Sequence, residues 1–188
     1  MSSEHYRRAQ IPPMNKVNYI KLAFAVLMAL YGIICAKDLR DAGMLDRVNL
    51  VAHEAGHLLL SWFGEFIQVL GGTLGQLFVP IAFTVYFYLR REFFSSAVTL
   101  FWTGQSFLGI SVYIKDAQAM ELPLVSVGGG EDTIHDWNYI LSKLGILRWD
   151  HVLGSIAFLI GGVIMAVSVV WAVYDTFGAR GEDRVLDS

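Results

Sequence analysis

Long apolar runs, separated by short polar connectors, dominate this chain. A bilayer-spanning helix needs about 20 predominantly apolar residues, and five windows approach that length: 17–36, 50–70, 73–89, 93–114 and 152–174. The apolar residues gather in long runs instead of amphipathic stripes, which is typical of membrane helices. We therefore expect an all-α, polytopic membrane helix bundle of about five spans that forms one domain over residues 1–188.

Two connectors between the expected spans carry most of the structural information. The sequence Gly71-Gly72-Thr73-Leu74-Gly75 breaks the apolar pattern, and it predicts a tight turn or re-entrant bend between the second and third spans. The longest connector is the polar insert 115–151, within which we expect a short amphipathic helix over 136–146. Loops of this length in a compact domain are usually functional or disordered, so the insert is a candidate source of site residues.

Composition narrows the functional classes. The chain has 188 residues, 55% of them hydrophobic, and a net charge of −3, with a mean hydropathy of +0.49. It contains no basic patch, so we expect no nucleic-acid partner. The single cysteine, Cys35, excludes an intrachain disulfide and a cysteine-based zinc site. We expect a multi-pass integral protein of a bacterial cytoplasmic membrane, surrounded by the lipid bilayer.

The sequence His53-Glu54-Ala55-Gly56-His57 is an HExxH motif inside the second apolar window. On a helix, residues i and i+4 share one face, so both imidazoles can reach one metal ion. Glu54 lies about 100° round the helix from His53 and can act as general base toward a metal-activated water. Ionisable groups inside a membrane normally face a bundle interior or a water cavity. We therefore interpret the motif as a zinc site, with His53 and His57 as ligands and Glu54 as the catalytic base.

A catalytic zinc needs a third protein ligand and an open coordination position, and the polar insert offers two adjacent candidates. His135 is the best imidazole candidate, and Asp136 is the best carboxylate candidate. Only one of the two need bind the ion, while the other orients a ligand. Asp132, Glu131 and Asp116 are weaker candidates. A structural alternative is that Asp136 caps the helix that follows it, and the two roles are compatible.

The HExxH motif inside an apolar span, the glycine break with a following span, and the distal acidic motif together resemble the site-2-protease family of intramembrane zinc metalloproteases. The resemblance covers residues about 50–80 well and 115–140 loosely. It implies that His53 and His57 bind zinc, that Glu54 is the general base, and that the substrate is a membrane protein with a transmembrane helix. In that family the third ligand is an aspartate in an Asp-Gly motif, and this chain contains no Asp-Gly dipeptide.

From the motif and the resemblance we expect a membrane-embedded zinc metalloprotease that hydrolyses peptide bonds in or near transmembrane segments. The expected cofactor is Zn2+, held by His53, His57 and either His135 or Asp136. Two alternatives use the same residues. One is a zinc-dependent hydrolase of a lipid amide or ester, and the other is a non-catalytic metal-binding scaffold for membrane partners.

Overall fold

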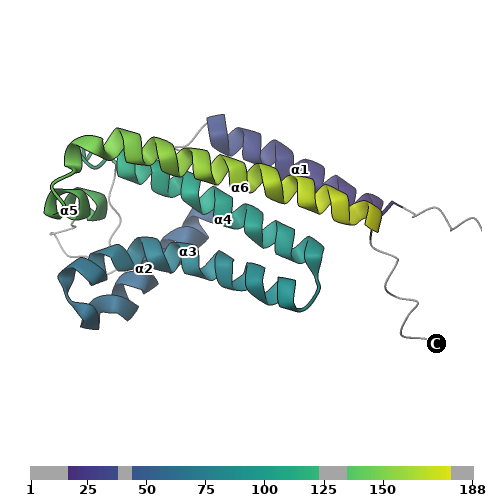
Figure 1. Ribbon diagram of the computed structural model, residues 1–188, viewed down its shortest axis with the longest axis horizontal. Helices are drawn as coiled ribbons and strands as arrows, with labels where there is room; N and C mark the ends of the chain where they lie inside the picture. The colour runs from purple at the N-terminus through teal and green to yellow at the C-terminus, as the bar shows by residue number, and fades with distance from the viewer. Residues whose placement is uncertain (1–16, 38–43, 123–134, 179–188) are drawn as a thin grey trace, which may run out of the picture.

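The computed structural model describes residues 17–37, 44–122 and 135–178, and every regular element in these ranges is a helix. Four long helices run roughly along one axis (Figure 1): α1 (Tyr19–Lys37), α3 (Glu65–Leu89), α4 (Phe93–Lys115) and α6 (Asp150–Gly178). The shorter elements are α2 (Met44–Leu60), α5 (Asp136–Lys143) and the two 3-10 turns Ser61–Phe63 and Leu147–Trp149. The expected all-α helix bundle is confirmed.

The bundle is built around the antiparallel pair α4 and α6, which lie side by side along most of their length (Figure 1). Two glycines permit this close approach. A Cβ on Gly104 would lie 2.8 Å from the carbonyl oxygen of Gly161, and a Cβ on Gly161 would lie 2.6 Å from the carbonyl oxygen of Gly104. Small residues at helix interfaces are a common means of close packing in membranes. On this pair, α1 packs against α6, and α3 packs against α4 and carries α2.

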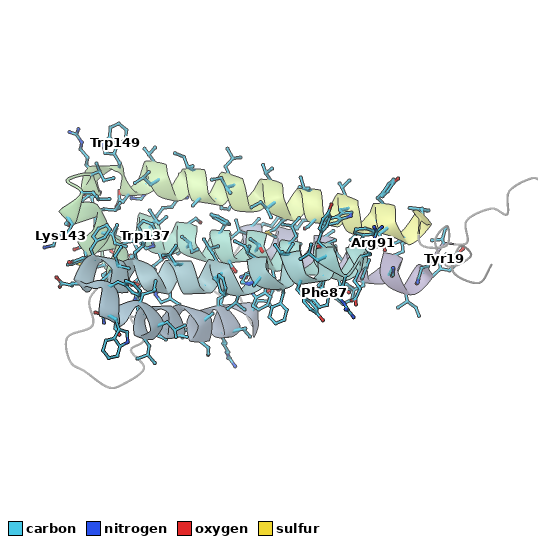
Figure 2. All side chains as sticks on the ribbon, turned by 60° about the horizontal axis from the view of Figure 1, so that its bottom comes forward. Tyr19, Phe87, Arg91, Trp137, Lys143 and Trp149 are labelled. Carbon is cyan, nitrogen blue, oxygen red and sulfur yellow. The ribbon has the colours of Figure 1, made fainter. Side chains whose placement is uncertain are left out.

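The two ends of the bundle are polar, and the surface between them is apolar. Arg91 lies at one end, while Lys143 and Trp149 lie at the other (Figure 2). At the first end, Nζ of Lys21 is 2.7 Å from Oδ2 of Asp175. The second end, which we call the α5 end, is covered by α5 (Figure 1). Between the ends, many large apolar side chains of the long helices are exposed, as expected for surfaces that face lipid.

Four helical segments are long and apolar enough to cross a membrane: Tyr19–Lys37, Glu65–Leu89, Phe93–Lys115 and Leu147–Phe177. This composition is consistent with an integral membrane protein. The expected second span, 50–70, is not among them, because α2 ends at Leu60 and α3 begins at Glu65. The windows 50–70 and 73–89 are therefore one short helix followed by one long helix. Within the described residues, the candidate spans number four instead of the five expected.

The turn between α2 and α3 lies at Gly64, not at the predicted glycine break. Gly64 has a φ of 89° and a ψ of 161°, a backbone conformation that is essentially restricted to glycine. Gly71, Gly72 and Gly75 lie inside the continuous helix α3. There they face α2, since a Cβ on Gly71 would lie 2.6 Å from the carbonyl oxygen of Gly56. The prediction of a turn was wrong because these glycines serve close helix packing, which leaves the helical hydrogen bonds of α3 intact.

Candidate metal centre

Three side chains that commonly bind metals converge near the α5 end. His53 and His57 lie one turn apart on α2, and Asp136 is the first residue of α5. Oδ2 of Asp136 is 2.8 Å from Nε2 of His53 and 3.2 Å from Nε2 of His57, and the three ligand atoms lie within 4.8 Å of one another. Ligand atoms about 2.0 Å from a tetrahedral zinc are about 3.3 Å apart. These three residues, which we call the metal group, could therefore hold a metal ion.

The backbone of α3 fixes the tautomer of His57. Nδ1 of His57 lies 2.8 Å from the carbonyl oxygen of Gln68. A carbonyl oxygen only accepts hydrogen bonds, so Nδ1 carries the hydrogen, and the lone pair of the neutral ring is on Nε2, which faces Asp136. Nε2 of His57 and Oδ2 of Asp136 are both hydrogen-bond acceptors. At 3.2 Å from each other, they need a proton or a cation between them. Two imidazole nitrogens and one carboxylate oxygen form a donor set that suits zinc.

The end of α4 holds Asp136 in place. The backbone N–H of Asp136 donates to the hydroxyl oxygen of Tyr113 at 3.1 Å, and the Tyr113 and His53 ring centroids are 6.0 Å apart. Burial disfavours the charged carboxylate, but hydrogen bonds with His53 and His57 outweigh burial and lower the pKa of Asp136 below its ordinary value. The carboxylate is therefore ionised at neutral pH, which is the form that binds metals.

His135, the alternative third ligand, is turned away from the two histidines of α2. Its Nε2 lies 3.2 Å from Oδ2 of Asp116, and its Nδ1 accepts the backbone N–H of Asn138 at 3.2 Å. His135 is thus the residue that caps α5, and the alternative role of Asp136 as the cap was wrong. Asp116 also accepts two backbone N–H groups of the following turn and does not belong to the metal group. Of the adjacent pair, the structure brings Asp136 to the HExxH histidines.

Gly72 of α3 packs directly against the two imidazoles. A Cβ at this position would lie 2.5 Å from Nε2 of His57 and would contact the ring of His53. Next to it, the backbones of α2 and α3 touch at Gly56 and Gly71. Residue 72 can therefore carry no side chain while the two imidazoles keep these positions. The signal for this packing in the sequence is the glycine cluster, a pattern that also predicts a turn.

A buried polar network fixes α2 against α4, one turn before His53. Oδ1 of Asn49 accepts from Nε1 of Trp102 at 2.7 Å and from Oγ of Ser106 at 3.2 Å. Nδ2 of Asn49 donates to Oε1 of Gln105 at 2.8 Å. Asn49 is only 2% exposed, and directional bonds in an apolar surrounding are costly to break. The network thus restricts the rotation of α2 about its axis, which determines where the His53 imidazole points.

Glu54, the predicted base, directly follows His53 on α2 and is half-buried. Its carboxylate is close enough to act electrostatically on His57. Two of the weaker ligand candidates, Glu131 and Asp132, lie outside the residues that the structure describes.

The metal group lies near one end of the bundle. Gly72 is about 10 Å along α3 from Glu65, at 1.5 Å per residue, and Tyr113 is in the last turn of α4. The side chain of His57 is 21% exposed, whereas that of Asp136 is 7% exposed. The ligand atoms are therefore about two helical turns from the α5 end, and the group reaches the protein surface through His57.

Comparison with known proteins finds no family model, no curated protein and no solved structure that matches this chain. The HExxH motif and the geometry of His53, His57 and Asp136 are therefore the features that indicate a function.

Proposed function

We propose that this chain is a multi-pass membrane protein and a zinc metalloprotease that hydrolyses peptide bonds in or near transmembrane segments of membrane proteins. One observation carries the proposal: the ligand atoms of His53, His57 and Asp136 lie within 4.8 Å of one another, beside the glutamate of the HExxH motif. Two imidazoles, one carboxylate and a neighbouring glutamate are the residues with which zinc peptidases work. Zinc is the ion that this donor set favours.

The residues of the site have different roles in the proposed hydrolysis. When bound, zinc would polarise the scissile carbonyl and lower the pKa of a water molecule toward about 7. Glu54 accepts the proton of the attacking water and returns it to the leaving amine. The carbonyl oxygen of Gln68 keeps His57 in the tautomer that leaves Nε2 free. Hydrogen-bond partners of metal-binding histidines usually fix the tautomer in this way.

The position of the site favours bonds near the end of a substrate helix. The ligand atoms lie about two turns from the α5 end, since Gly72 is about 10 Å from the start of α3. A peptide carbonyl inside a helix is hydrogen-bonded, so the substrate must unwind locally before attack. The last four carbonyl groups of a helix have no intrahelical partner, and unwinding costs least there. We therefore propose a transmembrane segment cleaved near its end as the substrate.

The test is product analysis with the purified full-length protein in lipid nanodiscs. Synthetic transmembrane peptides are incubated with the zinc-loaded protein, and the products are identified by mass spectrometry. We expect hydrolysis of peptide bonds near helix ends, loss of hydrolysis after chelation, and recovery when zinc is added back. Release of fatty acids or amines from the nanodisc lipids would point instead to a lipid hydrolase. Stoichiometric zinc without turnover of any peptide or lipid would contradict the proposal and favour a scaffold.

A further inference from the structure

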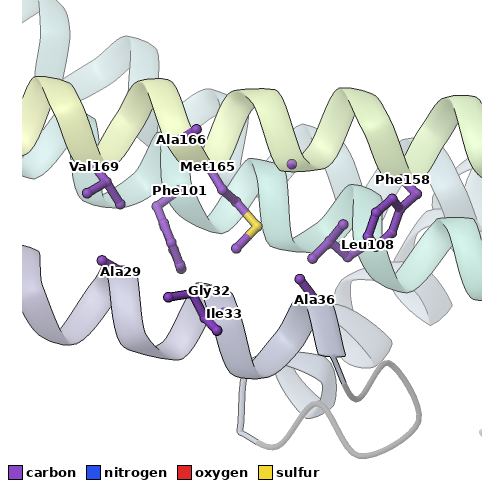
Figure 3. A pocket seen from close by; sticks show the side chains of 11 residues that line it. Ala29, Gly32, Ile33, Ala36, Phe101, Leu108, Phe158, Met165, Ala166 and Val169 are labelled. Atoms are coloured by element: carbon purple, nitrogen blue, oxygen red, sulfur yellow. The ribbon is translucent and has the colours of Figure 1, made fainter.

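An apolar cavity lies between α1, α4 and α6, apart from the metal centre (Figure 3). Its volume is about 390 Å³, and apolar residues line it, among them Ala29 and Gly32 of α1. Phe101 and Leu108 line it from α4 and flank the midpoint of that helix. If these helices cross a bilayer, the cavity lies at the depth of the lipid hydrocarbon.

The cavity opens onto the lateral surface of the bundle, and α1 is tied to α6 at the end away from α5. There Lys21 pairs with Asp175, and the backbone N–H of Asn18 donates to the carbonyl oxygen of Thr176 at 3.2 Å. Small residues of α1 line the cavity, and other lining positions on α1 and α6, among them Ile33 and Ala166, are exposed. Lipid therefore has direct access to it.

Two lysines flank the cavity on the side of the α5 end. Lys37 is the last residue of α1 and directly follows Ala36, which lines the cavity. Nζ of Lys115 lies 5.5 Å from the ring centroid of Phe158, another lining residue. The Lys115 side chain runs over Gly154, where a Cβ would lie 2.5 Å from its Cγ. In the ion pairs found among the described residues, neither lysine takes part.

The length of α1 places Lys37 at a membrane surface. Nineteen residues at 1.5 Å each span about 28 Å, which matches the hydrocarbon thickness of about 30 Å. If α1 begins at one surface, Lys37 therefore lies at the other, where lipid phosphate groups are found. A lysine side chain can bury its alkyl stem against apolar surface while its ammonium reaches that level, and the stem of Lys115 lies against α6 in this way.

We propose that the cavity binds one acyl chain of an anionic phospholipid and that Lys37 and Lys115 bind its phosphate. An apolar cavity of this kind does not retain water, and in a membrane the lipid chain is the hydrocarbon that can fill it. Two ammonium groups beside the opening select a lipid with net negative charge. The site is independent of His53, His57 and Asp136, so it stands or falls separately from the proposed protease activity.

The headgroup half of the proposal is tested by native mass spectrometry of the full-length protein with phosphatidylglycerol and with phosphatidylcholine of the same acyl chains. We expect about one tightly bound phosphatidylglycerol and weaker binding of phosphatidylcholine. Lys37→Gln and Lys115→Gln should each weaken phosphatidylglycerol binding about fivefold and leave phosphatidylcholine unchanged. Lys143→Gln is the matched control, because Nζ of Lys143 also lies over an aromatic ring, 5.3 Å from the Tyr139 centroid, but away from the cavity.

The acyl-chain half is tested by filling the cavity. Gly162 lines it, and a Cβ there would have no heavy atom within 4 Å, so a side chain can start there without a clash, and Gly162→Phe should lower binding of both lipids at least tenfold. Ala166→Phe, at another lining position, should act in the same way. Val163→Phe is the control, because Val163 is 54% exposed and does not line the cavity.

Three results would overturn the proposal. They are unchanged phosphatidylglycerol binding in both cavity-filling variants, equal binding of the two lipids with no effect of the lysine variants, and thermal stabilisation by glycerol phosphate equal to that by phosphatidylglycerol. The last result would mean that the lysines bind free phosphate.

Discussion

Nε2 of His53 lies 2.8 Å from Oδ2 of Asp136, although 83 residues separate the two along the chain. Each residue is held by different neighbours. The position of His53 is set by the position of α2. Glycine contacts with α3 and the hydrogen bonds of Asn49 hold α2 in place. Asp136 is held by the hydroxyl group of Tyr113 at the end of α4. Because different contacts position His53 and Asp136, the metal group is preformed, which favours tight and specific metal binding.

We predict that the purified protein binds about one zinc ion per chain, because three protein ligands converge on one point. His53→Ala and His57→Ala should each abolish stoichiometric binding. Elemental analysis after dialysis measures the zinc content. Full retention of zinc in the double variant would place the metal elsewhere.

Glu54→Gln should keep the zinc and lose the hydrolytic activity by about 10²-fold to 10⁴-fold, since an amide has the shape of the carboxylate but cannot take the proton of water. Glu65→Gln is the control, because Glu65 is an exposed glutamate at the start of α3. Zinc content and peptide turnover are measured on the same preparations. Near wild-type turnover in Glu54→Gln would mean that another group is the base.

Asp136→Ala and His135→Ala should differ in kind. Removing the Asp136 carboxylate deletes a ligand, so stoichiometric zinc should be lost. Removing His135 deletes the cap of α5 and the contact with Asp116. This change should weaken zinc binding about 10-fold to 100-fold, as is typical when a residue that orients a metal ligand is lost. Competition titration with a zinc-binding dye gives both affinities. The opposite order would make His135 the ligand.

Gly72→Ala should eliminate zinc binding without removing any ligand. The new methyl group would lie 2.5 Å from Nε2 of His57 and against the His53 ring, so the two imidazoles would have to move out of the arrangement that brings their nitrogens near Asp136. Gly162→Ala is the matched control, because its Cβ would have no heavy atom within 4 Å. Circular dichroism and gel filtration show whether each variant folds, and elemental analysis gives the zinc content. Wild-type zinc in folded Gly72→Ala would refute this location for the ion.

Asn49→Leu should lower the free energy of unfolding by about 1–3 kcal/mol, since it leaves Trp102 and Gln105 with unpaired buried groups. It should also weaken zinc binding, because the rotation of α2 is no longer fixed. Thr99→Val is the control. It removes the 3.0 Å hydrogen bond between the Thr84 and Thr99 hydroxyl groups, which joins α3 to α4, and should leave zinc affinity unchanged. The absorption spectrum of bound Co2+ reports the ligand geometry in each variant, and a wild-type spectrum in Asn49→Leu would exclude a role in orienting the histidines.

The sequence alone was sufficient for features that depend on local pattern. Continuous apolar runs of about 20 residues have few alternatives to a membrane helix, so the sequence predicted the all-α class. Four of the five expected spans coincide with helices that are long and apolar enough to cross a membrane. The pairing of His53 with His57 was equally local, because a spacing of four residues on a helix determines a shared face.

Only the tertiary structure decided which elements meet. The sequence left His135 and Asp136 as alternatives, because neighbouring residues at the start of a helix point in different directions, and the contacts of α4 decide which of them faces α2. The same holds for Gly71, Gly72 and Gly75. A glycine cluster can end a helix or let a second helix approach it, and the sequence pattern is the same in both cases. Here α2 packs against the cluster, and the chain turns instead at Gly64, the position whose backbone conformation only glycine adopts readily.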